Sequence, residues 1–425
     1  GIISYFNDDF LFTNNSIHSS YIYYDLVVSG NNSLIEGNTF ANGTLGIIID
    51  EGSHNRVINN TFRDYYQKND INWNGRGVIS FDFGNNNTLS NNLFDNITVH
   101  ALSLVSSKDN IISYNLFNDT GIFWHSIMDY SGERNNYNNN TFNKCGSQQP
   151  YWGHSCMMIV FNWGMSWDDR YGGEHMFENN HFFDFQIGIN IESFQNNNTV
   201  RNNSFNEGWN AIGLWAWPEG GTASSGNLIA NNTINNTDFP IALDFEKANY
   251  PGINNVVIFN HMTNTAGRAI SVWGCYQNFT IKDNYIDNAS VGIWIYDNTF
   301  GDISNGIVTN NILKNITYNG VSAFTQFGSS ISMNNIHVEN NFIHTISGVG
   351  IFFRDVVEGY IANNTIQANM SANSQISGIL ANNVPKTIIR NNTVSSAIGI
   401  EVGGSKDTTF PIKIENNVLH VNDYG

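Results

Sequence analysis

The feature that most constrains the fold is a pair of adjacent asparagines that recurs along the whole chain. An alternating apolar segment precedes each pair, and a small or polar residue and then Phe, Ile, Leu or Val follow it. Copies include LFTNNSI from Leu11, VINNTF from Val57, LIANNTI from Leu228, YIANNTI from Tyr360 and IKIENNVL from Ile412. The second asparagine recurs after 23 residues between Asn15 and Asn38 and after 22 between Asn38 and Asn60. Strand-like alternation at this period, without a helical stretch, predicts stacked β-coils.

We therefore predict an all-β parallel β-helix, a solenoid of about sixteen coils that forms a single domain over residues 1–425. Asparagine tolerates the left-handed backbone region that a sharp bend requires. Its amide both donates and accepts, so asparagines on successive coils are expected to form a hydrogen-bonded ladder at one turn. The Phe or Ile that follows each pair is expected to turn inward and stack on its counterpart one coil away. A low-complexity Asn tract would not explain the flanking apolar alternation.

A second alternating segment follows each pair after about a dozen residues and begins with a small residue. Examples are GIIID from Gly46, GINIE from Gly188, IALDFE from Ile241 and GIWIYD from Gly292. With the Asn-Asn motif, these segments resemble the parallel β-helix repeat family, which includes pectate-lyase-like, NosD-like and periplasmic copper-binding-type repeat proteins. The resemblance covers nearly the whole chain and implies a right-handed helix. It implies no single activity, because this fold hosts lyases, hydrolases, epimerases, phage spikes, adhesins and surface-layer proteins.

The second segments also predict an outward column of acidic and aromatic side chains. Alternation places apolar residues inward and their neighbours outward. Consecutive coils then stack five outward residues at about 4.8 Å per step: Glu192, Trp215, Asp244, Trp273 and Trp294. Tryptophan beside carboxylates is typical of a sugar-binding face, since the ring stacks on a pyranose and the acid accepts hydroxyl hydrogen bonds. The candidates for carbohydrate contact are Trp215, Trp217, Trp273, Trp294, Tyr296 and Trp167. The alternative, that a long loop or a neighbouring subunit covers this face, stays open.

Catalysis is the less favoured interpretation of the column. Glu192 and Asp244 are the candidate catalytic pair, two coils and roughly 10 Å apart, which is near the upper end for an inverting glycosidase. The paired Asp, Gly-His-Gly and Arg-Ile-Lys clusters of polygalacturonases are absent. No Lys or Arg is expected in the column, which disfavours a lyase. If the chain is an enzyme, we expect a polysaccharide hydrolase or epimerase.

A longer interval between asparagine pairs, 40 residues from Asn140 to Asn180, predicts a loop insertion at about 143–175. Cys145 and Cys156 flank a short stretch of it and are a candidate disulfide, with free thiols as the alternative. His154 and His175 are interpreted as packing residues in preference to metal ligands. No metal site or cofactor is predicted, although a Ca²⁺ ion is not ruled out.

The net charge and the glycosylation sequons indicate which partners and which location to expect for the chain. The net charge is −18 with 18 Lys and Arg, which disfavours nucleic acid and anionic membranes as partners. An anionic polysaccharide would be repelled unless a metal ion bridged the two. No apolar run reaches the roughly 20 residues that span a bilayer. Asn-x-Ser/Thr sequons are abundant, and those outside the asparagine pairs are the glycosylation candidates: Asn42, Asn96, Asn118, Asn278, Asn288, Asn315 and Asn369.

We therefore expect a secreted, glycosylated structural or adhesive protein of the cell surface, one part of a larger extracellular assembly. Its expected partners are copies of itself, other surface proteins, and polysaccharides or glycans. The ends of the sequence are interpreted as those of a mature or excerpted segment. A polysaccharide-active enzyme and a carbohydrate-binding module, each using the outward column, remain the alternatives.

Overall fold

A computed structural model describes most of the chain. The described residues are 2–5, 8–18, 24–66, 76–121, 125–146, 155–160, 172–192, 194–216, 224–245, 251–297, 302–326, 333–368, 376–404 and 411–421. All their regular structure is β-strand, and every pairing between strands is parallel. The internal contacts divide the chain into unit 1, Gly1–Ile212, and unit 2, Gly213–Gly425. We describe each unit by itself.

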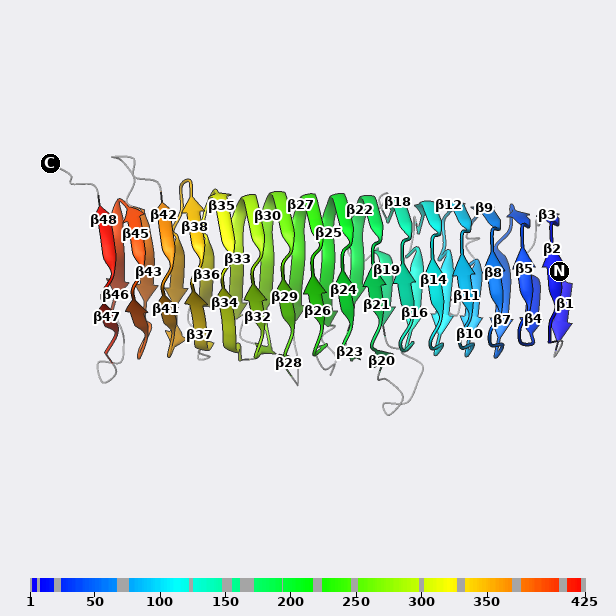
Figure 1. Cartoon of the computed structure of the whole chain (residues 1–425), viewed down its shortest axis with the longest axis horizontal. Coiled ribbons are helices and arrows are strands. Elements are labelled where there is room, and N and C mark those ends of the chain that lie inside the picture. Colours follow the sequence, from blue (N-terminus) through cyan, green and yellow to red (C-terminus); the bar gives the residue numbers. More distant parts are fainter. Residues whose placement is uncertain are drawn as a thin grey trace. The chain divides into compact units, whose positions relative to one another are not determined.

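Unit 1 repeats three strand positions in each coil, and Figure 1 shows the strands at one position stacked on those of the next coil. Its strands are β1 (Ile2–Tyr5), β2 (Leu11–Thr13), β3 (Ser16–His18), β4 (Tyr24–Ser29), β5 (Leu34–Glu36), β6 (Thr39–Ala41), β7 (Leu45–Asp50), β8 (Arg56–Ile58), β9 (Thr61–Tyr65), β10 (Ile79–Asp82), β11 (Thr88–Ser90), β12 (Leu93–Ile97), β13 (Leu102–Val105), β14 (Ile111–Ser113), β15 (Leu116–Thr120), β16 (Ile127–Tyr130), β17 (Asn136–Asn138), β18 (Thr141–Cys145), β19 (Ser155–Val160), β20 (Gly172–Gly173), β21 (Met176–Glu178), β22 (His181–Ile191), β23 (Gln195–Asn196) and β24 (Thr199–Arg201). Strand β25 (Ser204–Ala216) contains the boundary.

Unit 2 follows the same plan. Its strands are β26 (Leu228–Ala230), β27 (Thr233–Phe245), β28 (Gly252–Ile253), β29 (Val256–Ile258), β30 (His261–Trp273), β31 (Tyr276–Gln277), β32 (Thr280–Lys282), β33 (Tyr285–Asp297), β34 (Ser304–Thr309), β35 (Ile312–Ile316), β36 (Val321–Thr325), β37 (Met333–Glu339), β38 (Phe342–Thr345), β39 (Ile351–Arg354), β40 (Val356–Val357), β41 (Tyr360–Ala362), β42 (Thr365–Ala368), β43 (Ser377–Asn382), β44 (Ile388–Arg390), β45 (Thr393–Ser396), β46 (Ile398–Gly403), β47 (Lys413–Glu415) and β48 (Val418–Val421). The predicted parallel β-helix is therefore confirmed, whereas the prediction that residues 1–425 form a single domain stays a prediction.

The predicted insertion at about 143–175 is wrong in one respect. Its apolar stretch Ser155–Val160 forms strand β19, which pairs with β16 on one side and β22 on the other. All six residues of this strand are buried, because their apolar side chains continue the packing of the neighbouring coils. A complete strand position thus interrupts the predicted loop.

The two asparagines of each turn pair have different roles. The first is exposed and adopts a positive φ, 57° at Asn59 and 55° at Asn363. The second forms the ladder and is buried in every coil except those of Asn15 and Asn417. The side-chain nitrogen and the backbone nitrogen of Asn60 both donate to Asn92 Oδ1, at 3.1 and 2.9 Å. The predicted Asn ladder is confirmed, with eight members in each unit. They are Asn15, Asn38, Asn60, Asn92, Asn115, Asn140, Asn180 and Asn203 in unit 1, and Asn232, Asn260, Asn284, Asn311, Asn341, Asn364, Asn392 and Asn417 in unit 2.

The residue two positions after the ladder asparagine fills the core in every coil except those of Ile17 and Leu419, and its type differs between the units. In unit 1 these residues form a column of parallel phenylalanine rings with centroids 4.5–5.0 Å apart, a spacing at which aromatic rings attract. The column contains Phe40, Phe62, Phe94, Phe117, Phe142, Phe182 and Phe205. In unit 2 the same position holds buried aliphatic side chains: Ile234, Met262, Ile286, Leu313, Ile343, Ile366 and Val394.

Glycines open the second strand of several coils in unit 2 because the chain passes close to these aliphatic side chains. A Cβ atom at Gly350 would overlap Ile366 Cγ2 and lie 2.6 Å from the carbonyl oxygen of Gly378. We expect Gly350→Ala to lower the free energy of unfolding by about 1–3 kcal/mol, since overpacking against backbone is not easily relieved. Chemical denaturation measures this change.

Gly404 is the matched control, because a Cβ atom there would have no neighbour within 4 Å. We expect Gly404→Ala to change the free energy of unfolding by no more than about 0.5 kcal/mol. Equal stability of the two variants would contradict the close approach at Gly350.

Candidate functional site

Three long strands of unit 2 carry Asp244 and the first three outward aromatic residues. Strands β27, β30 and β33 have 13 residues each, because each continues from the ladder turn into the second segment without a break. The pairing of β30 with β33 is irregular between Thr265 and Arg268, where β30 has one residue more than its partner. Such a bulge redirects the side chains beside it. Here the Arg268 guanidinium lies over the ring of Trp294, with Cζ 3.5 Å from the ring centroid.

Outward rings of β30, β33, β36 and β39 pack on one another across successive coils. We call these five residues, Trp273, Trp294, Tyr296, Phe324 and Phe352, the aromatic stripe. Their ring centroids are 4.8 Å apart for Trp294 and Tyr296, 5.0 Å for Tyr296 and Phe324, and 5.6 Å for Phe324 and Phe352. Trp273 lies farther off, 6.4 Å from Tyr296. All five are partly buried, so the stripe is a packed surface rather than a row of separate projecting rings.

A second arginine lies at the other end of the stripe. Arg354 follows Phe352 at the next outward position of β39, and its Cζ is 5.1 Å from the ring centroid of Phe324 and 5.8 Å from that of Phe352. Its Nη2 donates to the carbonyl oxygen of Thr325 at 2.9 Å. The expectation that the column holds no Lys or Arg is therefore wrong, and with it the argument against a lyase. Arg268 reaches the stripe through a bulge, and Arg354 lies beyond the coils that the sequence analysis followed.

The electrostatics of the stripe centre on Arg268 and Asp244. Burial lowers the pKa of Arg268 from its ordinary value, and the opposing carboxylate of Asp244 and the Tyr296 phenol limit the decrease. Asp244 pairs with Trp273 in the strand register and accepts a hydrogen bond from Ser271 Oγ at 3.3 Å. The guanidinium remains charged at neutral pH, because arginine has an ordinary pKa above 12. Asp244 is the carboxylate that opposes the positive charge of Arg268.

Other members of the predicted column lie elsewhere. Glu192 is 3% exposed in unit 1, where its Oε1 accepts from Asn190 Nδ2 at 3.3 Å. It was expected on an open outward face, and burial corrects that expectation. Asp244 belongs to unit 2, so the catalytic pair stays a prediction. Trp215 is partly buried, whereas Trp217 and Trp167 lie outside the described residues.

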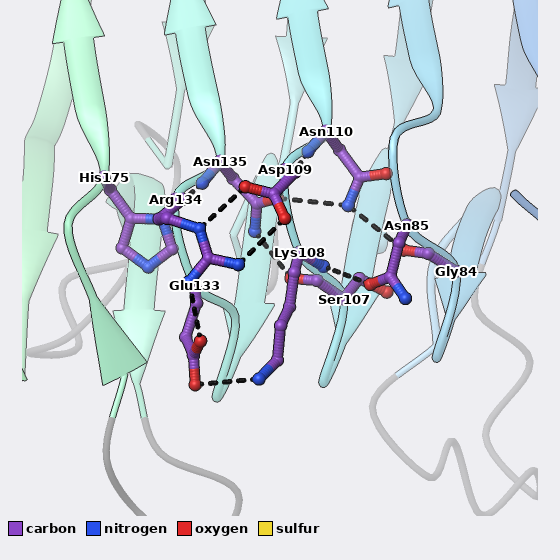
Figure 2. Close-up of polar contacts among 10 residues, drawn as sticks. All are labelled: Gly84, Asn85, Ser107, Lys108, Asp109, Asn110, Glu133, Arg134, Asn135 and His175. Carbon is purple, nitrogen blue, oxygen red and sulfur yellow. Dashed lines mark hydrogen bonds and ion pairs between the residues drawn. The ribbon is translucent and has the colours of Figure 1, made fainter. Parts of the chain in front are cut away.

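His175 occupies a ladder position instead of a metal site. A second column of asparagines runs beside the first in unit 1, and Figure 2 shows Asn110, Asn135 and His175 in it. The backbone N–H of Asn135 donates to His175 Nδ1 at 3.2 Å, and the N–H of His175 donates to Asn198 Oδ1 at 2.9 Å. Burial lowers the pKa of His175, so its ring is neutral at pH 7. Within the described ranges, no group of three His, Cys, Asp or Glu residues is placed to hold a metal ion.

Exposed ion pairs join neighbouring turns beside this second ladder. Arg134 donates to both carboxylate oxygens of Asp109, at 2.7 and 2.8 Å, and Lys108 Nζ lies 3.0 Å from a carboxylate oxygen of Glu133 (Figure 2). Each of these residues is exposed enough for water to screen the pair, and such pairs contribute at most about 1 kcal/mol. These ion pairs therefore stabilise the turns slightly, and they do not indicate a ligand site.

Inside unit 1, a polar cluster that the sequence analysis missed surrounds Asp129. This carboxylate is fully buried at a core position between Leu104 and Ile159 of the adjacent coils. Tyr137 Oη donates to it at 2.6 Å and Asn135 Nδ2 at 2.9 Å. Alternation alone marks Asp129 as an inward residue, and that signal was available. Because the cluster is buried, it is not a site for a polymer.

The candidate glycosylation sites fall into two groups. The side-chain nitrogen already donates to a neighbouring coil at four of them: Asn96 to Asp64 (2.8 Å), Asn118 to Asp95 (2.6 Å), Asn288 to Asn264 (2.9 Å) and Asn315 to Asp287 (2.8 Å). Asn42 and Asn278 are exposed. Asn369 lies outside the described residues. Asn288 and Asn315 are exposed too, but their side-chain nitrogens are engaged, so Asn42 and Asn278 are the favoured sites.

Cys145 and Cys156 are joined by a disulfide, with their Cα atoms 5.2 Å apart. The bond links the end of β18 to β19, so it fastens the two ends of the stretch between these strands. Cys275 is a buried free thiol in unit 2. Among the residues that the structure describes, no helix is long and apolar enough to span a membrane.

This architecture is that of a right-handed parallel β-helix. Residues 1–163 match the family model described as a right-handed β-helix region, which confirms the resemblance found in the sequence. No curated protein sequence matches the chain. Among solved structures, PfbA, a surface adhesin of Streptococcus pneumoniae, is 13% identical with a TM-score of 0.51, over 76% of this chain and 83% of that one.

Two further solved structures are more distant. The periplasmic alginate epimerase AlgG is 11% identical with a TM-score of 0.47, over 92% of this chain and 77% of that one. A tailspike protein of E. coli bacteriophage HK620, in complex with a hexasaccharide, is 12% identical with a TM-score of 0.43, over 85% of this chain and 58% of that one. At such low identities a likeness shows the fold alone.

Proposed function

We propose that this chain is an extracellular surface protein that binds a polysaccharide through the aromatic stripe of unit 2, without cleaving it. The observation that carries the proposal is the packing of outward rings from four neighbouring strands into one surface, with arginines over two parts of it. The rings occupy two adjacent outward rows of the strands and are tilted by 29–51° to one another, so they form a continuous aromatic surface along successive coils that an extended polymer can follow. Aromatic surface of this kind is costly to leave without a partner.

The outward carboxylates favour binding over hydrolysis. Glycoside hydrolysis requires two carboxyl groups about 5–9.5 Å apart. Asp244 is the one carboxylate at the described outward positions that align with the stripe on β27, β30, β33, β36 and β39. Its register partner is Trp273, Tyr296 follows one coil further, and Ser271 donates to it; none of the three is a second carboxyl group.

The proposed location rests on two features. The Cys145–Cys156 disulfide is typical of proteins that mature in an oxidising compartment. The exposed sequons at Asn42 and Asn278 are placed to carry glycans if the source attaches them. The proposal includes the rigid β-helix as one element of a larger assembly. That a surface adhesin shares the fold agrees with this proposal but does not carry it.

A titration with a panel of neutral and acidic oligosaccharides tests the proposal. We expect at least one of them to bind and to change the tryptophan fluorescence, because Trp273 and Trp294 belong to the stripe. Replacing Tyr296, whose ring packs against Trp273, Trp294 and Phe324, by alanine should weaken that binding about 10-fold or more, as for a central aromatic contact of an interface. Tyr360→Ala is the matched control, since Tyr360 lies on β41, away from the stripe. Absence of binding across the panel would refute the proposal, and turnover would show that the site is catalytic.

A further inference from the structure

The side chains of the two arginines extend in opposite directions along the stripe, each towards the coils that lie between them. Arg268 belongs to β30 and lies over the ring of Trp294 in β33, the next coil. Arg354 belongs to β39 and lies over the ring of Phe324 in β36, the preceding coil. Strands β33 and β36 are themselves paired neighbours. The stripe therefore has a guanidinium at each end of its central rings.

Stacking on a ring does not occupy the in-plane N–H donors of a guanidinium, although Nη2 of Arg354 already donates to the carbonyl oxygen of Thr325. The group is planar, its N–H donors lie in that plane, and their geometry matches both oxygens of a carboxylate. The ring below holds the plane in one orientation, so less entropy is lost when an anion binds. At 3.5 Å from Arg268 Cζ, one face of Trp294 is occupied. The ring thus supports Arg268 and does not offer that face to a pyranose.

The charge around these arginines is unusual for this chain. The whole sequence has only 18 Lys and Arg against 36 Asp and Glu. Arg354 approaches the Asp355 carboxylate at a long 3.9 Å, and Arg268 is opposed by Asp244. At physiological salt, charges more than about 8 Å away are largely screened, so the local arginines outweigh the distant acidic surface. The expected repulsion of an anionic polysaccharide does not extend to this patch.

We propose that the polysaccharide bound by the stripe is acidic, and that Arg268 and Arg354 each bind a carboxylate of its sugar residues. This inference rests on the proposed function and names the chemical class of its ligand. Asp244 then competes with the carboxylate of the ligand, because both interact with the positive charge of Arg268. No metal ion takes part in the contact.

The test compares an oligo-uronate tetrasaccharide with a neutral tetrasaccharide, titrated by calorimetry in EDTA. We expect the acidic ligand to bind at least 10-fold more tightly than the neutral one, and its affinity to fall as NaCl is raised. Arg268→Gln and Arg354→Gln should each weaken acidic binding about 10-fold and weaken neutral binding by a smaller factor, so that the preference for the acidic ligand falls. Arg268→Lys should lose most of the same affinity, because an ammonium lacks the planar fork.

Two variants make the test specific. Asp244→Asn should tighten acidic binding about 3- to 10-fold, whereas a catalytic or hydroxyl-accepting Asp244 would predict weaker binding. Arg390→Gln is the matched control: Arg390 lies 5.0 Å from the Tyr360 ring, a similar stack away from the stripe. Circular dichroism of every variant excludes loss of folding.

The possible outcomes separate this inference from the function on which it rests. Tight neutral binding that the arginine variants do not change would overturn the inference and leave the proposed function intact. A requirement for added Ca²⁺ would overturn it too, since a metal bridge would then hold the carboxylates. Preference for a sulfated over a uronate tetrasaccharide would reject the carboxylate. Absence of binding to every ligand would refute both.

Discussion

Replacing Asn364 by leucine should lower the free energy of unfolding by about 4 kcal/mol, the largest effect that we expect from one substitution. Asn364 Oδ1 accepts from both the backbone nitrogen and the side-chain nitrogen of Asn341, each at 3.0 Å. Its own Nδ2 donates to the carbonyl oxygen of Val338 at 2.8 Å and to Asn392 Oδ1 at 3.0 Å. Leucine removes all of these contacts and leaves several buried polar groups without a partner, at about 1–3 kcal/mol each.

Urea unfolding of the purified variant measures the change. The neighbouring Asn363 provides the control, because it is exposed and occupies the left-handed backbone region with φ 55°. Asn363→Gly keeps that conformation accessible and should cost only a few tenths of a kcal/mol. If Asn364→Leu were as stable as the parent chain, the ladder would not hold the coils together.

Acidification should destabilise unit 1 between about pH 6.5 and pH 4. Burial lowers the pKa of His100 to about 4, and its neutral ring stays in place by donating from Nδ1 to the carbonyl oxygen of His125 at 3.1 Å. The unfolded chain binds a proton at an ordinary pKa of about 6.5, but the folded chain does not until about pH 4. Stability therefore falls as the pH decreases through this window, by up to about 3 kcal/mol from His100 alone. Burial lowers the pKa of His175 as well and adds to the same trend.

Unfolding midpoints measured from pH 7 to pH 4 test this expectation. His100→Gln should flatten the profile, because glutamine does not titrate. His18→Gln is the control in the same unit, since the His18 side chain is exposed. A His100→Gln profile as steep as that of the parent chain would assign the acid sensitivity to other groups.

The fold could be predicted because its causes repeat. Each coil repeats the same turn, ladder residue and inward residue. A period of twenty-odd residues therefore predicts parallel stacking without knowledge of contacts between residues far apart in the sequence. The separate roles of the two asparagines come from the structure and not from the sequence: Asn59 adopts a positive φ, whereas Asn60 is buried in the ladder. His175 shows the limit of the pattern: an imidazole nitrogen substitutes for an amide oxygen in a ladder, and spacing alone does not reveal this.

The candidate site could be predicted only in part, because it depends on departures from the repeat. Alternation indicates the outward positions of Trp273, Trp294 and Tyr296, but the predicted stacking of Trp273 on Trp294 in one column is wrong. The register pairs Trp273 with Tyr296 and Ser271 with Trp294, because alternation does not fix the alignment of one coil on the next. It does not indicate that a bulge in β30 aims Arg268 at a ring, since the register shift follows from local pairing with β33. It also does not show that the rings pack on one another instead of projecting singly. The position two residues after the ladder asparagine holds stacked phenylalanines in unit 1 and aliphatic residues in unit 2. This difference is visible in the sequence but has no evident functional reason.

The most direct test of the central claim is a crystal structure of this chain with a bound oligosaccharide taken from the titration panel. We predict sugar density along the aromatic stripe, over Tyr296, Phe324 and Phe352, with acidic groups directed at Arg268 and Arg354. An oligosaccharide bound elsewhere on the chain, with the stripe unoccupied or covered by another segment, would contradict the account.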